Sequence, residues 1–249
     1  MARASLLAAL LLIAGSASGE PATGPTISLV IDDLGNNRHE AERVIQLPGS
    51  VVCAVLPHTR HAAAIAETAH AHGKPVILHL PMEPMADIDP GPGQIDSHMS
   101  LAQMQNALES DLASVPHAAG VSNHMGSLMT AQPVPMRWLM RALTRRHLYF
   151  IDSRTESGSL AAIIARQEGV PVLERQVFLD PDPSPATVAR QLERLEQLAR
   201  RHGHALAIGH PYLTTLAALE HWLPTLEAKG LKLVPPDSRM AMVQREEQP

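Results

Sequence analysis

The 249-residue sequence has few aromatic side chains, one cysteine and no excess of basic charge. Phe, Trp and Tyr occur twice each, so aliphatic side chains and 11 methionines must fill the core, and base stacking or aromatic-cage binding is disfavoured. The formal net charge is −5 with histidine neutral, which disfavours nucleic-acid binding. Cys53 has no cysteine partner and stands in an apolar run, so we expect a buried, inert thiol.

The only long apolar run stands at the start of the chain. Residues 6–14 are apolar, follow Arg3 and precede small residues at 15–19, which is the order of a secretory signal peptide. A membrane-spanning helix needs about 20 apolar residues, so a retained anchor is the less favoured alternative. We therefore expect a signal peptide over 1–19 and a periplasmic or secreted chain. The rest has no linker, which predicts one domain over 25–240 and a polar tail over 241–249.

Short apolar runs alternate with segments of helical periodicity along the mature chain. Strands are expected at 26–31, 51–56, 75–80, 119–122, 148–151, 171–179, 204–208 and 230–234. Helices are expected at 38–46, 60–72, 100–113, 134–146, 158–168, 185–202 and 213–228. This order predicts an α/β fold with a parallel sheet, either a (β/α) barrel or an open doubly wound sheet. No Gly-x-Gly-x-x-Gly follows a strand, so dinucleotide binding has no support.

Acidic and histidine side chains recur at the carboxyl ends of these strands, where parallel α/β folds carry their chemistry. They include Asp32, Asp33, His58, His79, His124, Asp152, Asp180 and His210. Adjacent carboxylates repel unless a cation or proton lies between them, so Asp32 and Asp33 suggest one base and one metal ligand, with a solvated loop pair as the alternative. A carboxylate with two imidazoles, such as His79 and His124, is a common set for a catalytic divalent metal. Each histidine taken singly is more simply a hydrogen-bonded strand-end residue.

Five blocks in order carry a family resemblance. They are Ile31-Asp32-Asp33-Leu34-Gly35, His79-Leu80-Pro81-Met82-Glu83-Pro84, Asn123-His124-Met125-Gly126-Ser127, Phe150-Ile151-Asp152-Ser153-Arg154-Thr155 and Ile208-Gly209-His210-Pro211. Over about residues 25–240 the sequence resembles the divergent polysaccharide deacetylase family, a distant branch of the NodB-type carbohydrate esterases. The resemblance implies a single-domain, distorted (β/α) barrel of about seven strands.

The resemblance also implies a divalent metal, usually zinc. Asp33 and His79 match family ligands, but Glu83 stands where ordinary NodB-type enzymes have their second histidine. Either Glu83 or His124 therefore completes the ligand set, and the divergent family's own pattern favours His124.

The remaining site residues follow from the same resemblance. Asp32 corresponds to the general base and His210 to the general acid, while Asp152 and Arg154 look like the block that orients the base. Asn123 joins Glu83 among the supporting or substrate-binding residues.

The activity implied is metal-dependent removal of acetyl groups from an N-acetylated glycan of the bacterial envelope, such as peptidoglycan. Scarce aromatic residues favour a short substrate over a long sugar-stacking groove. The altered histidine pair and a missing arginine-containing block support an alternative, a catalytically inactive metal- or glycan-binding envelope protein with a regulatory role.

Overall fold

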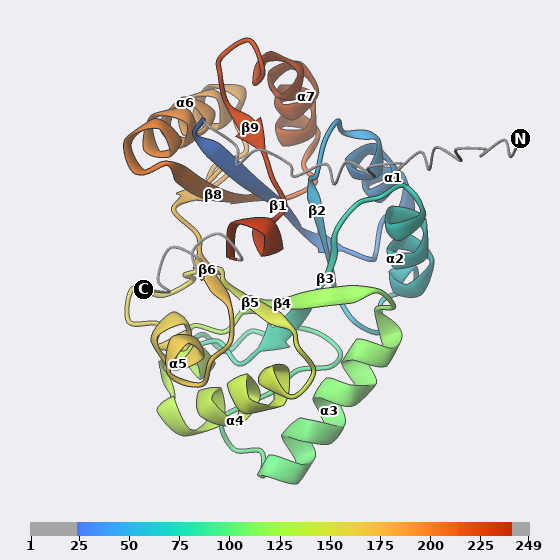
Figure 1. Ribbon diagram of the computed structural model, residues 1–249. Coiled ribbons are helices and arrows are strands. Elements are labelled where there is room, and N and C mark those ends of the chain that lie inside the picture. Colours follow the sequence, from blue (N-terminus) through green and yellow to red (C-terminus); the bar gives the residue numbers. More distant parts are fainter. Residues whose placement is uncertain (1–23, 241–249) are drawn as a thin grey trace, which may run out of the picture.

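The computed structural model describes residues 24–240, so the expected signal peptide at 1–19 and the tail at 241–249 lie outside the described residues. Strands and helices alternate along the chain (Figure 1). No helix within 24–240 combines the length and apolar character needed to cross a membrane. In chain order the elements are β1 (Thr26–Leu34), α1 (Arg38–Gln46), β2 (Val52–Val55), α2 (Ala62–Ala71), β3 (Val76–Met82), α3 (Leu101–Ser114), β4 (Ala118–Met125), η1 (Met129–Ala131), α4 (Pro133–Thr144), β5 (Tyr149–Asp152), α5 (Ala161–Gln167), β6 (Val172–Glu174), β7 (Val177–Phe178), α6 (Pro185–His202), β8 (His204–Gly209), α7 (Leu213–Trp222), η2 (Leu223–Thr225) and β9 (Lys232–Leu233).

The strands form one parallel sheet in the order β6-β5-β4-β3-β2-β1-β8-β7, with β9 also paired to β1. β6 and β7 end this order on opposite sides, yet only Arg175 and Gln176 separate them in the chain. The backbone N–H of Arg175 donates to Asp152 of β5 and that of Gln176 to Leu206 of β8, both at 3.0 Å. One segment therefore bridges both edges of the sheet, which curls into a distorted barrel and confirms the predicted fold class.

The barrel separates two groups of buried side chains, because successive residues of a strand face opposite sides. On β1, Leu29 and Ile31 pack in one cluster with residues of the surrounding helices, while Val30 belongs to a second apolar cluster inside the barrel with Met240. Asp32 follows Val30 at the same inward-facing spacing. The interior is therefore apolar near the amino ends of the strands and acidic where β1 ends.

A helical turn at residues 236–240 closes the amino end of the barrel; it is the short red helix below β1 in Figure 1. Met240 is buried in the inner cluster. Val234, two residues before this turn, is fixed to β1, since its N–H donates to the Ile27 carbonyl and its own carbonyl accepts from Ser28 Oγ, both at 2.8 Å. Access to the barrel is consequently from the carboxyl ends of the strands.

Local sequence explains where several helices begin and end. Asn37 and Ser100 cap α1 and α3 through their side chains, and Ser100 forms a capping box with Gln103. Helix α7 ends at Trp222 rather than near residue 228 as predicted, because Pro224 lies in the next turn, which tightens into the 3-10 helix η2. The predicted strand 171–179 is two short strands because the segment changes partner within the barrel.

Candidate metal and catalytic site

Side chains from the ends of β1, β3 and β4 converge at the open end of the barrel. Asp33 Oδ1 lies 2.9 Å from His124 Nδ1 and 3.3 Å from His79 Nε2, and the two ring nitrogens are 3.2 Å apart. These three residues form a group whose ligand atoms all lie within 4.8 Å of one another. The structure thus brings together the three residues that the sequence predicts as metal ligands.

The donor atoms of this cluster suit a divalent cation. Asp33 Oδ1 is buried and accepts no hydrogen bond of good geometry, although two imidazole nitrogens face it. Burial opposes the charge of Asp33, but His124 and His79 outweigh that effect and hold the pKa of the carboxyl well below its usual range. An ionised carboxylate oxygen and two imidazole nitrogens match the ligand chemistry of zinc.

The backbone at Asp33 explains how two adjacent carboxylates reach one site. Asp33 has φ +59°, a left-handed conformation that turns the chain as β1 ends. Asp32 therefore keeps the inward direction of the strand while Asp33 also faces the open end of the barrel.

A buried hydroxyl orients His79. Ser122 Oγ of β4 lies 2.8 Å from His79 Nδ1, and both residues are buried. With Nδ1 engaged by Ser122, Nε2 is directed at the carboxylates. Hydrogen bonds of this kind fix the rings of metal-binding histidines.

Asp32 lies beside the cluster without belonging to it. Its Oδ2 is 3.5 Å from His79 Nε2, and its Oδ1 is buried without a hydrogen-bond partner. Burial raises the pKa of this carboxyl, and the nearby His79 and His210 only partly oppose the rise. Asp32 is therefore a carboxylate whose basicity is increased next to the candidate metal ligands.

His210 approaches the cluster from β8 and is held by Asp180. Its Nε2 lies 3.6 Å from Asp33 Oδ2, while Nδ1 lies 3.0 Å from Asp180 Oδ1. Thr215 Oγ1 and the backbone N–H of His210 both donate to Asp180 Oδ2 at 2.7 Å. Burial disfavours the imidazolium, but the bond to Asp180 and the nearby carboxylates outweigh it and raise the pKa of His210 to about 9.

The sequence predicts that Asp180 stands at a strand end but indicates no role for it, and no motif singles out Thr215 or Ser122. The position of Asp180 could indicate its role, because it follows the strand that neighbours the one before His210, at the same carboxyl edge of the sheet. Nothing local in the sequence marks the two hydroxyl residues, because their partners lie on other elements.

Two of the predicted supporting residues shape the loops around the site. Asn123 joins β4 to β5, since its Oδ1 accepts from the Ser153 N–H and its Nδ2 donates to the Met125 carbonyl, both at 2.8 Å. Asp152 is fully buried and accepts from the Arg154 N–H and from Ser159 Oγ, also at 2.8 Å.

The other two, Glu83 and Arg154, have partners outside the cluster. Glu83 Oε2 accepts from the N–H and the Oγ of Ser97 at 2.8 and 2.6 Å, which anchors the loop over 84–98. The Arg154 guanidinium lies 3.5 Å from Glu174 and donates to the Ser157 carbonyl. His124, and not Glu83, is thus the residue that lies with Asp33 and His79.

Arg175 is a partly buried arginine whose pKa is affected by the charge of Asp32. Its Nε and Nη2 donate to the Ser153 and Arg154 carbonyls at 2.5 and 2.8 Å. Burial lowers the pKa of this guanidinium, and the charge of Asp32 is the strongest opposing influence. A partly buried positive charge therefore lies in the electrostatic range of the candidate base.

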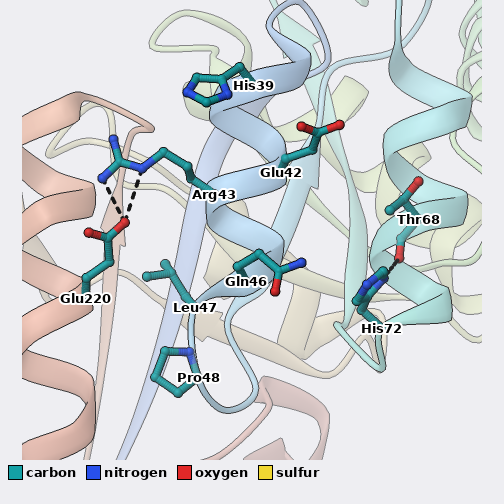
Figure 2. A pocket seen from close by; sticks show the side chains of 9 residues that line it. All are labelled: His39, Glu42, Arg43, Gln46, Leu47, Pro48, Thr68, His72 and Glu220. Carbon is teal, nitrogen blue, oxygen red and sulfur yellow. Dashed lines mark hydrogen bonds and ion pairs between the residues drawn. The ribbon is translucent and has the colours of Figure 1, made fainter.

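A cleft of about 430 Å³ adjoins the cluster and is lined by Asp33 and His124, by residues 56–60 and by residues 89–92. A second pocket, of about 520 Å³, lies on the outer surface among α1, α2 and α7 (Figure 2). Its Arg43 is paired with Glu220 at 2.7 Å, and none of the predicted site residues lines it. The inner cleft is therefore the opening that adjoins the candidate chemistry.

Comparison with known proteins identifies the family. The family model described as divergent polysaccharide deacetylase matches residues 29–240. The chain belongs to this family. The chain is 37% identical to the uncharacterized protein YibQ of Escherichia coli K12 over 210 residues, which are 84% of this chain and 66% of that protein. It is 38% identical to an uncharacterized protein of Haemophilus influenzae over 200 residues, 80% of this chain and 71% of that protein.

Solved structures support the fold of this chain. The uncharacterized protein ATU2773 from Agrobacterium tumefaciens C58 matches with a TM-score of 0.83 at 24% identity, over 88% of this chain and 89% of that chain. The catalytic domain of a peptidoglycan N-acetylglucosamine deacetylase from Eubacterium rectale matches with a TM-score of 0.52 at 17% identity, over 85% and 88%. The predicted NodB-like architecture is confirmed.

Proposed function

We propose that this protein is a metal-dependent hydrolase that removes acetyl groups from an N-acetylated glycan. The observation that carries the proposal is the convergence of Asp33, His79 and His124 next to Asp32 and His210. Membership of the divergent polysaccharide deacetylase family supports the class of substrate.

Zinc is the proposed metal, because one carboxylate and two imidazoles leave open positions typical of catalytic zinc. Asp33, His79 and His124 would hold it. When bound, such an ion polarises the amide carbonyl and lowers the pKa of water that reacts with it.

The chain supplies the two proton transfers of the reaction. As water adds to the acetyl carbonyl, Asp32 accepts the water proton at its unpartnered Oδ1. His210 donates a proton from Nε2 to the amide nitrogen as the carbon–nitrogen bond breaks, and acetate and a free amine leave. Asp180 fixes the His210 ring through Nδ1, so Nε2 remains directed at the site.

The substrate we propose is a short N-acetylated oligosaccharide, because the cleft of about 430 Å³ is in the range of small-ligand sites. An envelope location is proposed from the expected signal peptide at 1–19. The printed name of the Eubacterium rectale neighbour, a peptidoglycan deacetylase, supports a glycan with N-acetylglucosamine units.

The test is acetate release from N-acetylglucosamine oligomers by the zinc-loaded protein and its Asp32→Asn variant. We expect the variant to lose about 10²–10⁴-fold in kcat, the usual contribution of a general base, while its zinc content stays unchanged. Glu42→Gln is the matched control, since Glu42 is an exposed acid of α1 paired with Arg38. Metal-independent release, or full activity in Asp32→Asn, would contradict the proposal.

A second candidate is a metal- or glycan-binding protein of the envelope without turnover. It is supported by the position of Glu83, which replaces a histidine of ordinary NodB-type enzymes and is bonded to Ser97. Glycan binding without acetate release, across several oligomers and with zinc bound, would favour this second function.

A further inference from the structure

A second histidine–aspartate pair lies at the cleft, apart from the metal cluster. His58 follows β2 and lines the cleft that Asp33 and His124 also line. Its Nε2 lies 2.7 Å from Asp111 Oδ1 of α3. The metal cluster and His210 do not account for this pair.

The backbone at His58 is in an unfavourable conformation that other contacts maintain. Its φ is +54°, in the left-handed region that non-glycine residues rarely adopt. The His58 N–H donates to Ser114 Oγ at 3.2 Å, and Ser114 in turn donates to the Asp111 carbonyl at 2.7 Å. Strained residues held by their surroundings are common at functional sites.

Asp111 is a charged residue on the buried face of a helix. It is fully buried, and its Oδ2 has no hydrogen-bond partner among the described residues. A Cβ at Gly93 would lie 2.4 Å from Asp111 Oδ1, so the loop over 84–98 packs directly on this carboxylate. An apolar residue would fill this position without the cost of burying a carboxylate.

The Asp111 bond determines what His58 presents to the cleft. Asp111 Oδ1 engages Nε2, which holds the ring in one orientation, and Nδ1 is on the other side of the ring. Among residues 24–240 Nδ1 has no hydrogen-bond partner, and the His58 side chain is 34% exposed. The ring therefore offers its Nδ1, held in one orientation, to a ligand in the cleft.

We propose that His58 is a substrate-positioning residue whose Nδ1 hydrogen-bonds a hydroxyl of the sugar unit next to the one that is deacetylated. The inference rests on the proposed function and narrows the substrate to glycans of two or more units. Because the cleft continues from Asp33 and His124, its occupant is the part of the substrate adjoining the reacting group.

The test compares long and small substrates. His58→Gly removes the ring while tolerating the left-handed backbone, and His58→Asn tolerates the same backbone and keeps a short polar side chain. We expect His58→Gly to lower the ratio of kcat/KM for the N-acetylglucosamine tetramer to kcat/KM for p-nitrophenyl acetate by about fivefold or more, through KM. His58→Asn should restore part of the ratio. An equal loss on both substrates would indicate a merely structural role and overturn the proposal.

His117→Gly is the matched control. His117 has φ +65°, bonds a carboxylate of Glu67 through Nε2 at 2.8 Å and is 33% exposed, but it precedes the amino end of β4. Its substitution should leave the ratio unchanged.

Binding of the tetramer to the zinc-loaded protein, measured by isothermal titration calorimetry, separates this inference from the proposed function. If the wild type binds the tetramer without releasing acetate, a Kd about fivefold higher in His58→Gly would uphold the positioning role while hydrolysis fails. An unchanged Kd, or no binding by the wild type, would overturn it.

Discussion

His210 and Asp180 are joined twice, through the ring nitrogen Nδ1 to Oδ1 at 3.0 Å and through the backbone N–H to Oδ2 at 2.7 Å. Thr215 adds a third bond to the same carboxylate. Because both the ring and the backbone of His210 are held, its Nε2 has one direction, toward Asp33. The orientation of this histidine thus depends on a residue of the neighbouring segment after β7.

The Asp180 carboxylate should be necessary for turnover. In Asp180→Asn the side-chain amide removes the charge beside Nδ1 and allows the opposite tautomer of His210, so we expect kcat for acetate release to fall by about 100-fold or more. Thr215→Val removes only one bond and should have a smaller effect. Steady-state kinetics on N-acetylglucosamine oligomers, with thermal unfolding to verify the fold, measure both. Wild-type kcat in Asp180→Asn would exclude His210 as the proton donor.

Ser122 should influence metal affinity through His79. Loss of a hydrogen bond to a metal-binding histidine typically costs about 10–100-fold in affinity, so we expect that reduction in zinc affinity for Ser122→Ala. Ser28→Ala is the control, because Ser28 is also a buried serine of the sheet, bonded at 2.8 Å to Val234 near the closed end. It should lose about 1 kcal/mol of stability and no zinc affinity. Competition titration with a chelator measures this, and equal affinities in all three proteins would rule out His79 as a ligand.

His204 should make the protein less stable in mild acid. Burial, with a contribution from the charge of Arg239, lowers its pKa from 6.5 to about 4. The unfolded chain then binds the proton more tightly, so the free energy of unfolding is highest above pH 6.5 and decreases toward pH 4, by about 3 kcal/mol at most. Urea unfolding at pH 7.5 and pH 4 measures the difference. His204→Gln should reduce this loss and exposed His39→Gln should not; the same pH dependence in His204→Gln and the wild type would refute the assignment.

The site residues at strand ends could be predicted from the sequence, because local apolar patterns locate the strands that carry them. Apolar runs locate the parallel strands, and parallel strands bring their carboxyl ends to one edge, so Asp33, His79 and His124 were expected together. The roles of these residues in metal binding and catalysis stay predictions.

The residues that surround and orient the site residues could not be predicted from the sequence, because their positions depend on closure of the barrel. The 172–178 segment changes from β5 to β8 between Arg175 and Gln176, a switch set by two strands far apart in the chain. That switch places Arg175 within the electrostatic influence of Asp32, whereas the Arg154 guanidinium contacts Glu174 and the Ser157 carbonyl. No local pattern distinguishes the two arginines.

The pairing of β1 determines when this site can form. The strand that carries both aspartates pairs on one side with β2, which is close in the chain, and on the other side through Thr26–Ile31 with His204–Gly209, about 178 residues later. Such distant contacts form slowly, because a long loop must close before they contribute. An N-terminal fragment that ends before residue 204 retains Asp32, Asp33, His79 and His124 but lacks both β8 and His210. The full set of candidate site residues is therefore assembled late in folding, and incompletely folded chains do not present it.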